Sequence, residues 1–161
     1  MKFVIVDGQD QIIGYKERED INSEDIYRVS ALWITNTNKD ILLAQRSLNK
    51  INDPGKWGPA VAGTNEKGES YILNILKEAK EEIGIKIVNP ELSIKEKVVG
   101  EHNHFTQWFK LVLDIPLESL TINYDEINKV KWFSPEELQR KIKKNPNIFL
   151  KNFERYFKLF S

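Results

Sequence analysis

The chain has 161 residues, which is enough to bury a hydrophobic core without disulfides or a structural metal. It carries 24 basic and 24 acidic side chains, so it lacks the basic excess typical of broad nucleic-acid binding. It contains no cysteine, which excludes disulfides, thiolate metal sites and cysteine nucleophiles. No apolar run approaches the roughly 20 residues of a membrane helix, and Asp7 interrupts the short N-terminal run, unlike a signal peptide. We expect a single cytoplasmic domain over 1–161, with no membrane or nucleic-acid partner.

Turn signals divide the first half of the chain into short strands followed by a helix. Asp7-Gly8 is typical of a hairpin turn, which predicts an N-terminal hairpin within about 1–27. Gly84 supplies the left-handed residue that commonly closes a helix. The elements expected in this half are strands at 3–6, 11–15, 29–35, 41–45 and 57–62, loops at 16–27, 36–40 and 47–56, and a helix from Glu69 or Ser70 to Ile83.

The second half returns to strands and ends in helices. Ser134, Pro135 and Glu137 combine the cap, the first-position proline and the third-position glutamate of a helix start. The elements expected in this half are strands at 92–100, 105–114 and 130–133, a helix over 134–144, and an amphipathic terminal helix with Phe149, Phe153, Tyr156, Phe157 and Phe160, the two helices together filling about 134–160. This order predicts a mixed sheet packed between helices in one α/β (or α+β) domain.

The first expected helix has two chemically different faces. At about 100° per residue, four apolar side chains fall near Ile72 on one face. These are Ile75, Leu76, Ala79 and Ile83. Glu78, Glu81 and Glu82 gather on the other face, where they repel one another unless a cation lies between them. A hard cation such as Mg²⁺ prefers these oxygen ligands. From spacing alone, a cation site and a solvated acidic surface both stay open.

The segment 63–85 resembles the Nudix box. That pattern is G-x5-E-x7-R-E-U-x-E-E-x-G-U, where U is a bulky apolar residue. This chain has Gly63, Glu69, Lys77, Glu78, Ala79, Glu81, Glu82, Gly84 and Ile85 at those positions. Two positions depart from the pattern, since Lys77 replaces the arginine and Ala79 is small. The resemblance implies an α/β/α sandwich with a mixed sheet that hydrolyses a diphosphate linked to another group.

The resemblance also implies a metal site. Glu78, Glu81 and Glu82 would be the catalytic carboxylates and metal ligands, and the carbonyl of Ala62 would be a further ligand. The ion would be Mg²⁺, with Mn²⁺ as an alternative. It would neutralise the diphosphate, orient it and activate a water for attack on phosphorus.

Three further positions of the box would brace the site rather than bind metal. Glu69 and the residue at position 77 hold the loop and orient the first catalytic glutamate, and Gly63 shapes the loop itself. Lys77 keeps the positive charge of an arginine but lacks the planar fork that holds a carboxylate by two bonds. A diphosphate- or nucleotide-binding module with little turnover is therefore the alternative to an enzyme.

Candidates outside the box are less specific. Glu126 precedes Trp132 by six residues, where MutT-type members carry an acidic metal or base residue, although it also fits a strand-edge surface position. Glu101 is a second candidate for this acid. Arg46 would clamp phosphate or lie on the surface. Trp57, at the entrance of the box, would line the substrate pocket or belong to the core.

The N-terminal third resembles the isopentenyl-diphosphate-isomerase-like branch of the family. The matching segments are V-D-x-x-x-x-I-I-G, Y-R-V-S-A-L-W-I and I-L-L-A-Q-R-S-L-N-K. The isomerase uses a catalytic cysteine and a histidine-rich metal site. This chain has no cysteine, and Tyr27 stands where the branch often has histidine, so the resemblance implies a hydrolase. His102 and His104 fit an exposed turn better than a metal site. The sequence does not specify which small-molecule diphosphate is the substrate, whether the protein forms a homodimer, or what the basic C-terminal helix does.

Overall fold

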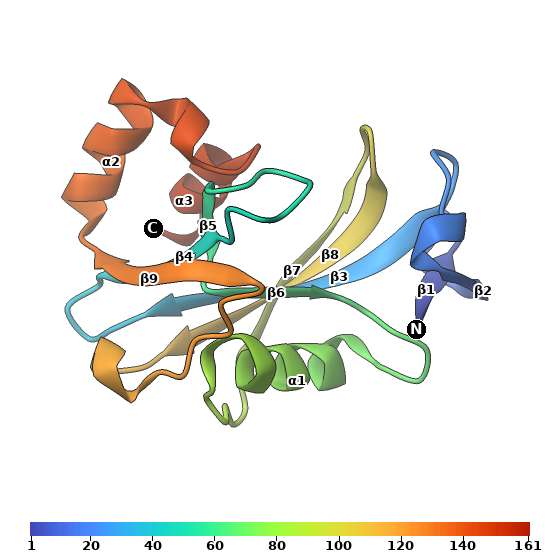
Figure 1. The fold of residues 1–161 in the computed structure, drawn as a ribbon, viewed down its shortest axis with the longest axis horizontal. Coiled ribbons are helices and arrows are strands. Elements are labelled where there is room, and N and C mark those ends of the chain that lie inside the picture. The colour runs from blue at the N-terminus through green and yellow to red at the C-terminus, as the bar shows by residue number, and fades with distance from the viewer.

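The computed structural model describes residues 1–161, which form a nine-stranded sheet with helices on both faces (Figure 1). The strands are β1 Lys2–Val6, β2 Ile12–Glu17, β3 Ile26–Thr35, β4 Ile41–Arg46, β5 Trp57–Pro59, β6 Val61–Thr64, β7 Glu91–Val98, β8 Asn103–Val112 and β9 Ile127–Phe133. The helices are α1 Tyr71–Ile83, α2 Pro135–Lys144 and α3 Phe153–Phe160, with short 3₁₀ helices η1 Arg18–Asp20, η2 Leu117–Ser119 and η3 Pro146–Ile148. None of them is long and apolar enough to cross a membrane. The mixed α/β architecture confirms the expected fold class.

The central strand β3 determines where the sheet opens. On one edge of β3, β8 pairs in parallel along the whole length of the strand. On the other edge three strands pair antiparallel one after another along β3, in the order β1, β6 and β4. Only Ile34 and Thr35 of β3 pair with β4, which continues to β5 and β9. The sheet therefore divides into two diverging halves, and Ala60 connects β5 in one half with β6 in the other (Figure 1).

Alternating side chains of β3 enter two separate cores. Leu32 and Ile34 face α1, in a cluster that includes Leu42, Val61, Ile75, Ala79, Ile83 and Phe109. Ala31 and Trp33 face α2 and α3, in a cluster that includes Leu43, Trp57, Trp108, Phe133, Leu138 and Phe153. The sheet is thus buried on both faces, as its runs of consecutive apolar residues require.

Helix α1 begins and ends where the sequence predicts. The hydroxyl of Ser70 accepts a hydrogen bond from the Leu73 amide at 3.3 Å, and Gly84 closes the helix with φ of +72°. The buried face is rotated relative to the prediction. Ile72 is 38% exposed, whereas Asn74 and Glu82 are buried with Ile75, Ala79 and Ile83. The expectation that the carboxylates lie opposite the core is therefore wrong for Glu82.

Several boundaries differ because strand pairing is decided by distant partners. The expected strand 57–62 is two strands, since β5 pairs with β4 and β6 pairs with β3. β2 and β3 extend into the expected loop 16–27. His104, expected in an exposed turn, lies in β8 and is half-buried. Phe149 precedes α3 rather than belonging to it, and its ring stacks on Phe153 at 4.7 Å.

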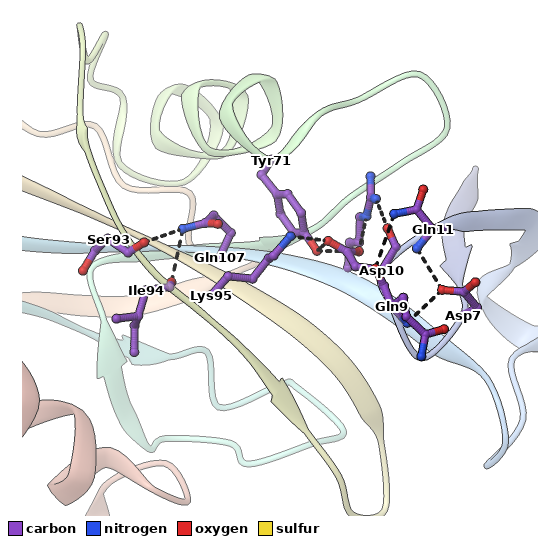
Figure 2. A network of polar contacts seen from close by, with 10 residues as sticks. Asp7, Gln9, Asp10, Gln11, Tyr71, Ser93, Ile94, Lys95 and Gln107 are labelled. Carbon is purple, nitrogen blue, oxygen red and sulfur yellow. Dashed lines mark hydrogen bonds and ion pairs between the residues drawn. The ribbon is translucent and has the colours of Figure 1, made fainter.

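Buried Asp10 ties the N-terminal hairpin to the rest of the molecule (Figure 2). Its carboxylate accepts hydrogen bonds from Arg28 Nε at 2.7 Å, Lys95 Nζ at 2.7 Å and the hydroxyl of Tyr71 at 3.0 Å. Burial raises the pKa of Asp10, but the hydrogen bonds from Lys95, Arg28 and Tyr71 outweigh it and hold the pKa below its ordinary value. Because Tyr71 is the first residue of α1, this network fixes the start of that helix.

Candidate active site

A pocket of about 590 Å³ lies beside the free edge of β6, where α1 crosses it. Glu78, Glu81 and Glu82 line it from α1, and Ala62 and Gly63 line it from β6. Pocket residues from the other half of the sheet are Arg46, Lys50, Asn52 and Glu126, and Glu101 and His102 come from the β7–β8 turn. The fold thus brings together most of the candidate residues from the sequence. They come from segments far apart in the chain, so no local sequence pattern predicts that they meet.

Gly63 allows α1 to approach β6. A Cβ atom at this position would overlap Cγ and Cδ of Glu78. The backbone of Gly63 has no positive φ, so its missing side chain is needed for space rather than for a turn. Glycine is therefore required here by the close approach of Glu78 to β6.

Ala62 lies where the strand edge has no neighbouring strand. Its amide donates to Oε2 of Glu82 at 3.4 Å. In antiparallel pairs the N–H and C=O of one residue point to the same side, so the carbonyl of Ala62 also points toward the free edge. This geometry is compatible with the expected role of that carbonyl as a metal ligand.

Burial and mutual repulsion perturb two of the three carboxylates. Glu82 is 9% exposed, and burial, followed by the charge of Glu78, raises the pKa of Glu82 to about 8. Burial also raises the pKa of Glu78 to about 7; the nearby Lys77 charge opposes this shift and Glu81 adds to it. Glu81 itself is exposed. Perturbed carboxylates that share a pocket are typical of functional sites.

Lys77 forms the ion pairs expected of the brace. Its Nζ lies 2.6 Å from Glu69, 3.1 Å from Glu66 and 3.5 Å from Glu78. Burial lowers the pKa of Lys77, but the hydrogen bonds to Glu69 and Glu66 and the charge of Glu78 raise it well above its ordinary value. Lysine thus replaces the fork of an arginine with one ammonium group shared by three carboxylates.

Two residues of the brace were missed by the sequence analysis. Asn74 Nδ2 donates to Glu69 at 2.8 Å and to Glu78 at 3.3 Å, and so links both carboxylates. Glu66 pairs with Lys77 at 3.1 Å, and its amide donates to Glu69 at 2.9 Å. The i,i+4 spacing of Asn74 and Glu78 on one helix face could have indicated the first of these contacts.

The opposite wall carries the cationic side chains. Lys50 Nζ lies 2.5 Å from Oε2 of Glu126, which places the expected acid outside the box at the pocket. Arg46 donates through Nε to the carbonyl of Asn52 at 3.0 Å, while its two Nη atoms have no partner within the chain. Glu101 lines the pocket from an exposed turn. Glu126 and Glu101 both line the pocket, so the geometry is compatible with either of them as the acid outside the box.

Trp57 does not reach the pocket. It is 8% exposed and lies in the core beneath α2 and α3, with its ring 5.0 Å from that of Phe133 in an edge-to-face contact. β5 pairs with β4, and this pairing directs the side chain of Trp57 into that core. The expectation that Trp57 lines the substrate pocket is not met.

The carboxylates suit a hard cation, although they do not form a closed ligand cage. No three His, Cys, Asp or Glu side chains converge closely enough to hold a metal by themselves. Mg²⁺ keeps several waters and completes its octahedron with substrate phosphates, so it needs few protein ligands. Glu78, Glu81 and Glu82 line the pocket next to Ala62 and so offer oxygen donors from α1 and β6. The oxygen-only donor set therefore fits a divalent hard cation.

A family model for the NUDIX domain matches residues 26–153. The chain belongs to the Nudix family. Nudix hydrolase 3 of Arabidopsis thaliana is 28% identical over 148 residues, which are 84% of this chain but only 19% of that protein. The prenyl-diphosphate phosphatase of Methanosarcina mazei is 30% identical over 149 residues, covering 89% of this chain and 85% of that protein. An isopentenyl-diphosphate Δ-isomerase of Aliivibrio fischeri is 24% identical over 169 aligned positions, covering 96% of this chain and 92% of that protein.

A solved structure agrees with the fold along nearly the whole chain. The Deinococcus radiodurans protein DR0079 superposes with a TM-score of 0.81, covering 98% of each chain at 20% identity. Identity at this level supports the fold alone. Membership in the Nudix family, whose hydrolases generally use divalent metals, supports hydrolysis of pyrophosphate bonds in small molecules.

Proposed function

We propose that this Nudix protein is a Mg²⁺-dependent hydrolase of the diphosphate linkage in a nucleoside diphosphate derivative or a related small molecule. The observation that carries the proposal is the position of half-buried Glu78 and buried Glu82 together at the edge of β6, with Lys77 contacting Glu78 and Arg46 facing both across one pocket. Two acids with raised pKa values next to cationic side chains suit a site for a metal and an anionic substrate.

Each group has a distinct role in this proposal. Glu78, Glu81, Glu82 and the carbonyl of Ala62 hold Mg²⁺, or Mn²⁺ in its place. When bound, the ion neutralises diphosphate charge and activates a water. Arg46 and Lys50 bind phosphate oxygens through their positive charges.

Glu126 acts as the general base in this proposal. It accepts a proton from the water that attacks phosphorus, and the bond between phosphorus and the bridging oxygen breaks. Glu126 forms an ion pair with Lys50 at the pocket, so this role requires Lys50 to turn to the substrate and leave the Glu126 carboxylate free. Glu101 is the second candidate for the base.

A specific observation favours a second substrate class. The relative with 30% identity is a prenyl-diphosphate phosphatase, which brings prenyl diphosphates alongside nucleotides as candidates. Isomerase activity is disfavoured, since the chain has no cysteine to act in acid–base chemistry on an isoprenoid double bond. The binding-module alternative rests on Lys77, and its three ion pairs argue for an intact brace.

The test is a panel of nucleotide and prenyl diphosphates incubated with Mg²⁺ or Mn²⁺, in which the phosphate monoester and phosphate products are separated and quantified by chromatography. We expect turnover of at least one substrate, and a loss of at least about a hundredfold in kcat for Glu81→Gln and Glu82→Gln. Glu91→Gln, at an exposed position on β7 outside the pocket, is the matched control. A folded protein that binds a diphosphate but cleaves none of the panel would establish the binding module instead.

A further inference from the structure

Asn74 is a polar side chain of α1 that is completely buried, with 0% of its surface exposed. Its Nδ2 donates to the carbonyl of Thr64 at 3.2 Å, to Glu69 at 2.8 Å and to Glu78 at 3.3 Å. Because all three partners are acceptors, the amide must present Nδ2 rather than Oδ1 to them. Its Oδ1 is buried without a partner, which lowers stability. Asparagine is therefore a poor choice for packing at this helical position, and its Nδ2 calls for another role.

Asn74 and Lys77 contact the same two carboxylates. Glu69 is held at both oxygens, because Lys77 Nζ lies 2.6 Å from Oε1 and Asn74 Nδ2 donates to Oε2 at 2.8 Å. Glu78 is held at Oε1, which lies 3.3 Å from Asn74 Nδ2 and 3.5 Å from Lys77 Nζ. These contacts at Oε1 leave Oε2 of Glu78 available to a cation.

The two side chains together offer what one arginine would offer. A guanidinium presents its donors in a planar fork that binds a carboxylate at both oxygens. Lys77 presents a single nitrogen, which also lies 3.1 Å from Glu66. Asn74 precedes Lys77 by three residues, a spacing that makes two side chains neighbours on a helix. Its amide therefore supplies the second donor to Glu69 that a lysine lacks.

The orientation of Glu78 depends on this second donor as well. Glu78 lies so close to β6 that a Cβ atom on Gly63 would overlap its Cγ and Cδ. Without Asn74, the contact of 3.5 Å with the flexible Lys77 side chain would be left to orient the carboxylate, whose terminal torsion is broad. Loss of a group that orients a metal ligand typically lowers metal affinity or activity by roughly 10- to 100-fold.

We propose that Asn74 is a positioning residue of the metal site, whose amide completes the brace formed by Lys77 and fixes the Glu78 carboxylate for the cation. The inference rests on the proposed function, and it assigns the compensation for the missing arginine to a residue outside the fixed positions of the box. Asn74 itself contacts neither metal nor substrate in this role. The effects of changing Asn74 and Lys77 are then coupled, because an arginine at position 77 supplies both donors to Glu69.

The experiment measures the Kd of the full chain for Mn²⁺, from the electron paramagnetic resonance signal of the free ion. The proteins are wild type, Asn74→Ala, Lys77→Arg and the double variant. Asn74→Ala is expected to weaken Mn²⁺ binding about tenfold when Lys77 is present, and less than about threefold when Lys77→Arg is present as well. At saturating metal, Asn74→Ala is also expected to lower kcat about tenfold with little change in KM, because the substrate contacts remain.

Ser30→Ala is the matched control. Ser30 is also 0% exposed, and its hydroxyl donates to the carbonyl of Tyr71 in α1 at 2.9 Å without contacting a carboxylate. This variant is expected to lower Tm but to leave the Kd for Mn²⁺ within about twofold of wild type. Asn74→Val keeps most of the buried volume and also lacks the donor, so it decides the outcome if Asn74→Ala does not fold.

Three results would overturn the role of Asn74. In the first, a folded Asn74→Ala or Asn74→Val binds Mn²⁺ as tightly as wild type. In the second, Asn74→Ala weakens binding equally with and without Lys77→Arg, and in the third, Ser30→Ala weakens it as much as Asn74→Ala does. Mn²⁺ binding by wild type without hydrolysis of any diphosphate contradicts the proposed function alone, because the set of Kd values still decides the role of Asn74. Absence of Mn²⁺ binding by wild type overturns the metal site on which both proposals rest.

Discussion

Replacing Glu82 by glutamine is expected to stabilise the metal-free protein while it removes most of the hydrolysis. Burial, followed by repulsion from Glu78, raises the pKa of Glu82 to about 8 from an ordinary value of 4.5. A carboxyl group with a raised pKa binds more protons in the folded state than in the unfolded state. Its contribution to stability is therefore full below about pH 4.5 and is lost as the pH rises toward about 8.

The size of this effect follows from the same two values. Integrating the proton difference from acid to pH 7 gives about 3 kcal/mol as an upper limit, at about 1.4 kcal/mol per pKa unit. Water entry into the pocket reduces the penalty, so we expect about 2 kcal/mol for Glu82→Gln at neutral pH. For a chain of this length that corresponds to a rise in Tm of roughly 4–8 °C.

The assay is thermal unfolding in a chelating buffer at pH 5 and at pH 8, for wild type, Glu82→Gln and Glu81→Gln. The Tm gain of Glu82→Gln should be small at pH 5, where the wild-type carboxyl is protonated, and large at pH 8. Glu81 is exposed, so Glu81→Gln should show no such pH-dependent gain. An equal gain at both pH values, or an equal gain for both variants, would refute the reasoning from buried charge.

Three further predictions concern contacts of the pocket and of the Asp10 network at the start of α1. Gly63→Ala should lower kcat by about a hundredfold, because its Cβ displaces the Glu78 side chain, whereas Gly14→Ala, which meets nothing within 4 Å, should be neutral in the same assay. Lys77→Arg should raise kcat severalfold by adding a bidentate contact, and an unchanged rate would mean that the lysine brace is already complete. Asp10→Ala should lower the free energy of urea unfolding by about 3 kcal/mol or more by breaking a buried ionic network, and Asp10→Asn, which tolerates the φ of +63°, should lower it less.

The sequence predicted helix α1 well because its signals are local. Ser70 and Gly84 fix its ends through contacts within a few residues, and the spacing of Glu78, Glu81 and Glu82 on one turn is a property of any helix. The arrangement of Lys77 with Glu69 was likewise indicated by a resemblance confined to one segment. These parts of the fold and site needed no knowledge of distant pairings.

Other features depend on contacts between segments far apart in sequence. The division of 57–62 into β5 and β6 follows from pairing with two different strands, and the burial of Trp57 follows from the same division. The rotation of the buried face of α1 toward Glu82 reflects the position of β6 beneath the helix. Phe3 and Tyr27 come to the pocket through β1 and β3, so no local pattern could place them beside the carboxylates.

The hydrogen bonds of Asp10 determine where this protein can be joined to a homologue in a chimera. The family match begins at residue 26, yet Asp10, sixteen positions earlier, binds Arg28, Tyr71 and Lys95, all inside the matched segment. A chimera joined at residue 26 would leave the cations of Arg28 and Lys95 without their shared acceptor. It would also leave the hydroxyl of Tyr71, the first residue of α1, without that acceptor. The unit to exchange between homologues is therefore the hairpin together with the matched segment, because the boundary of sequence similarity falls inside a single network of hydrogen bonds.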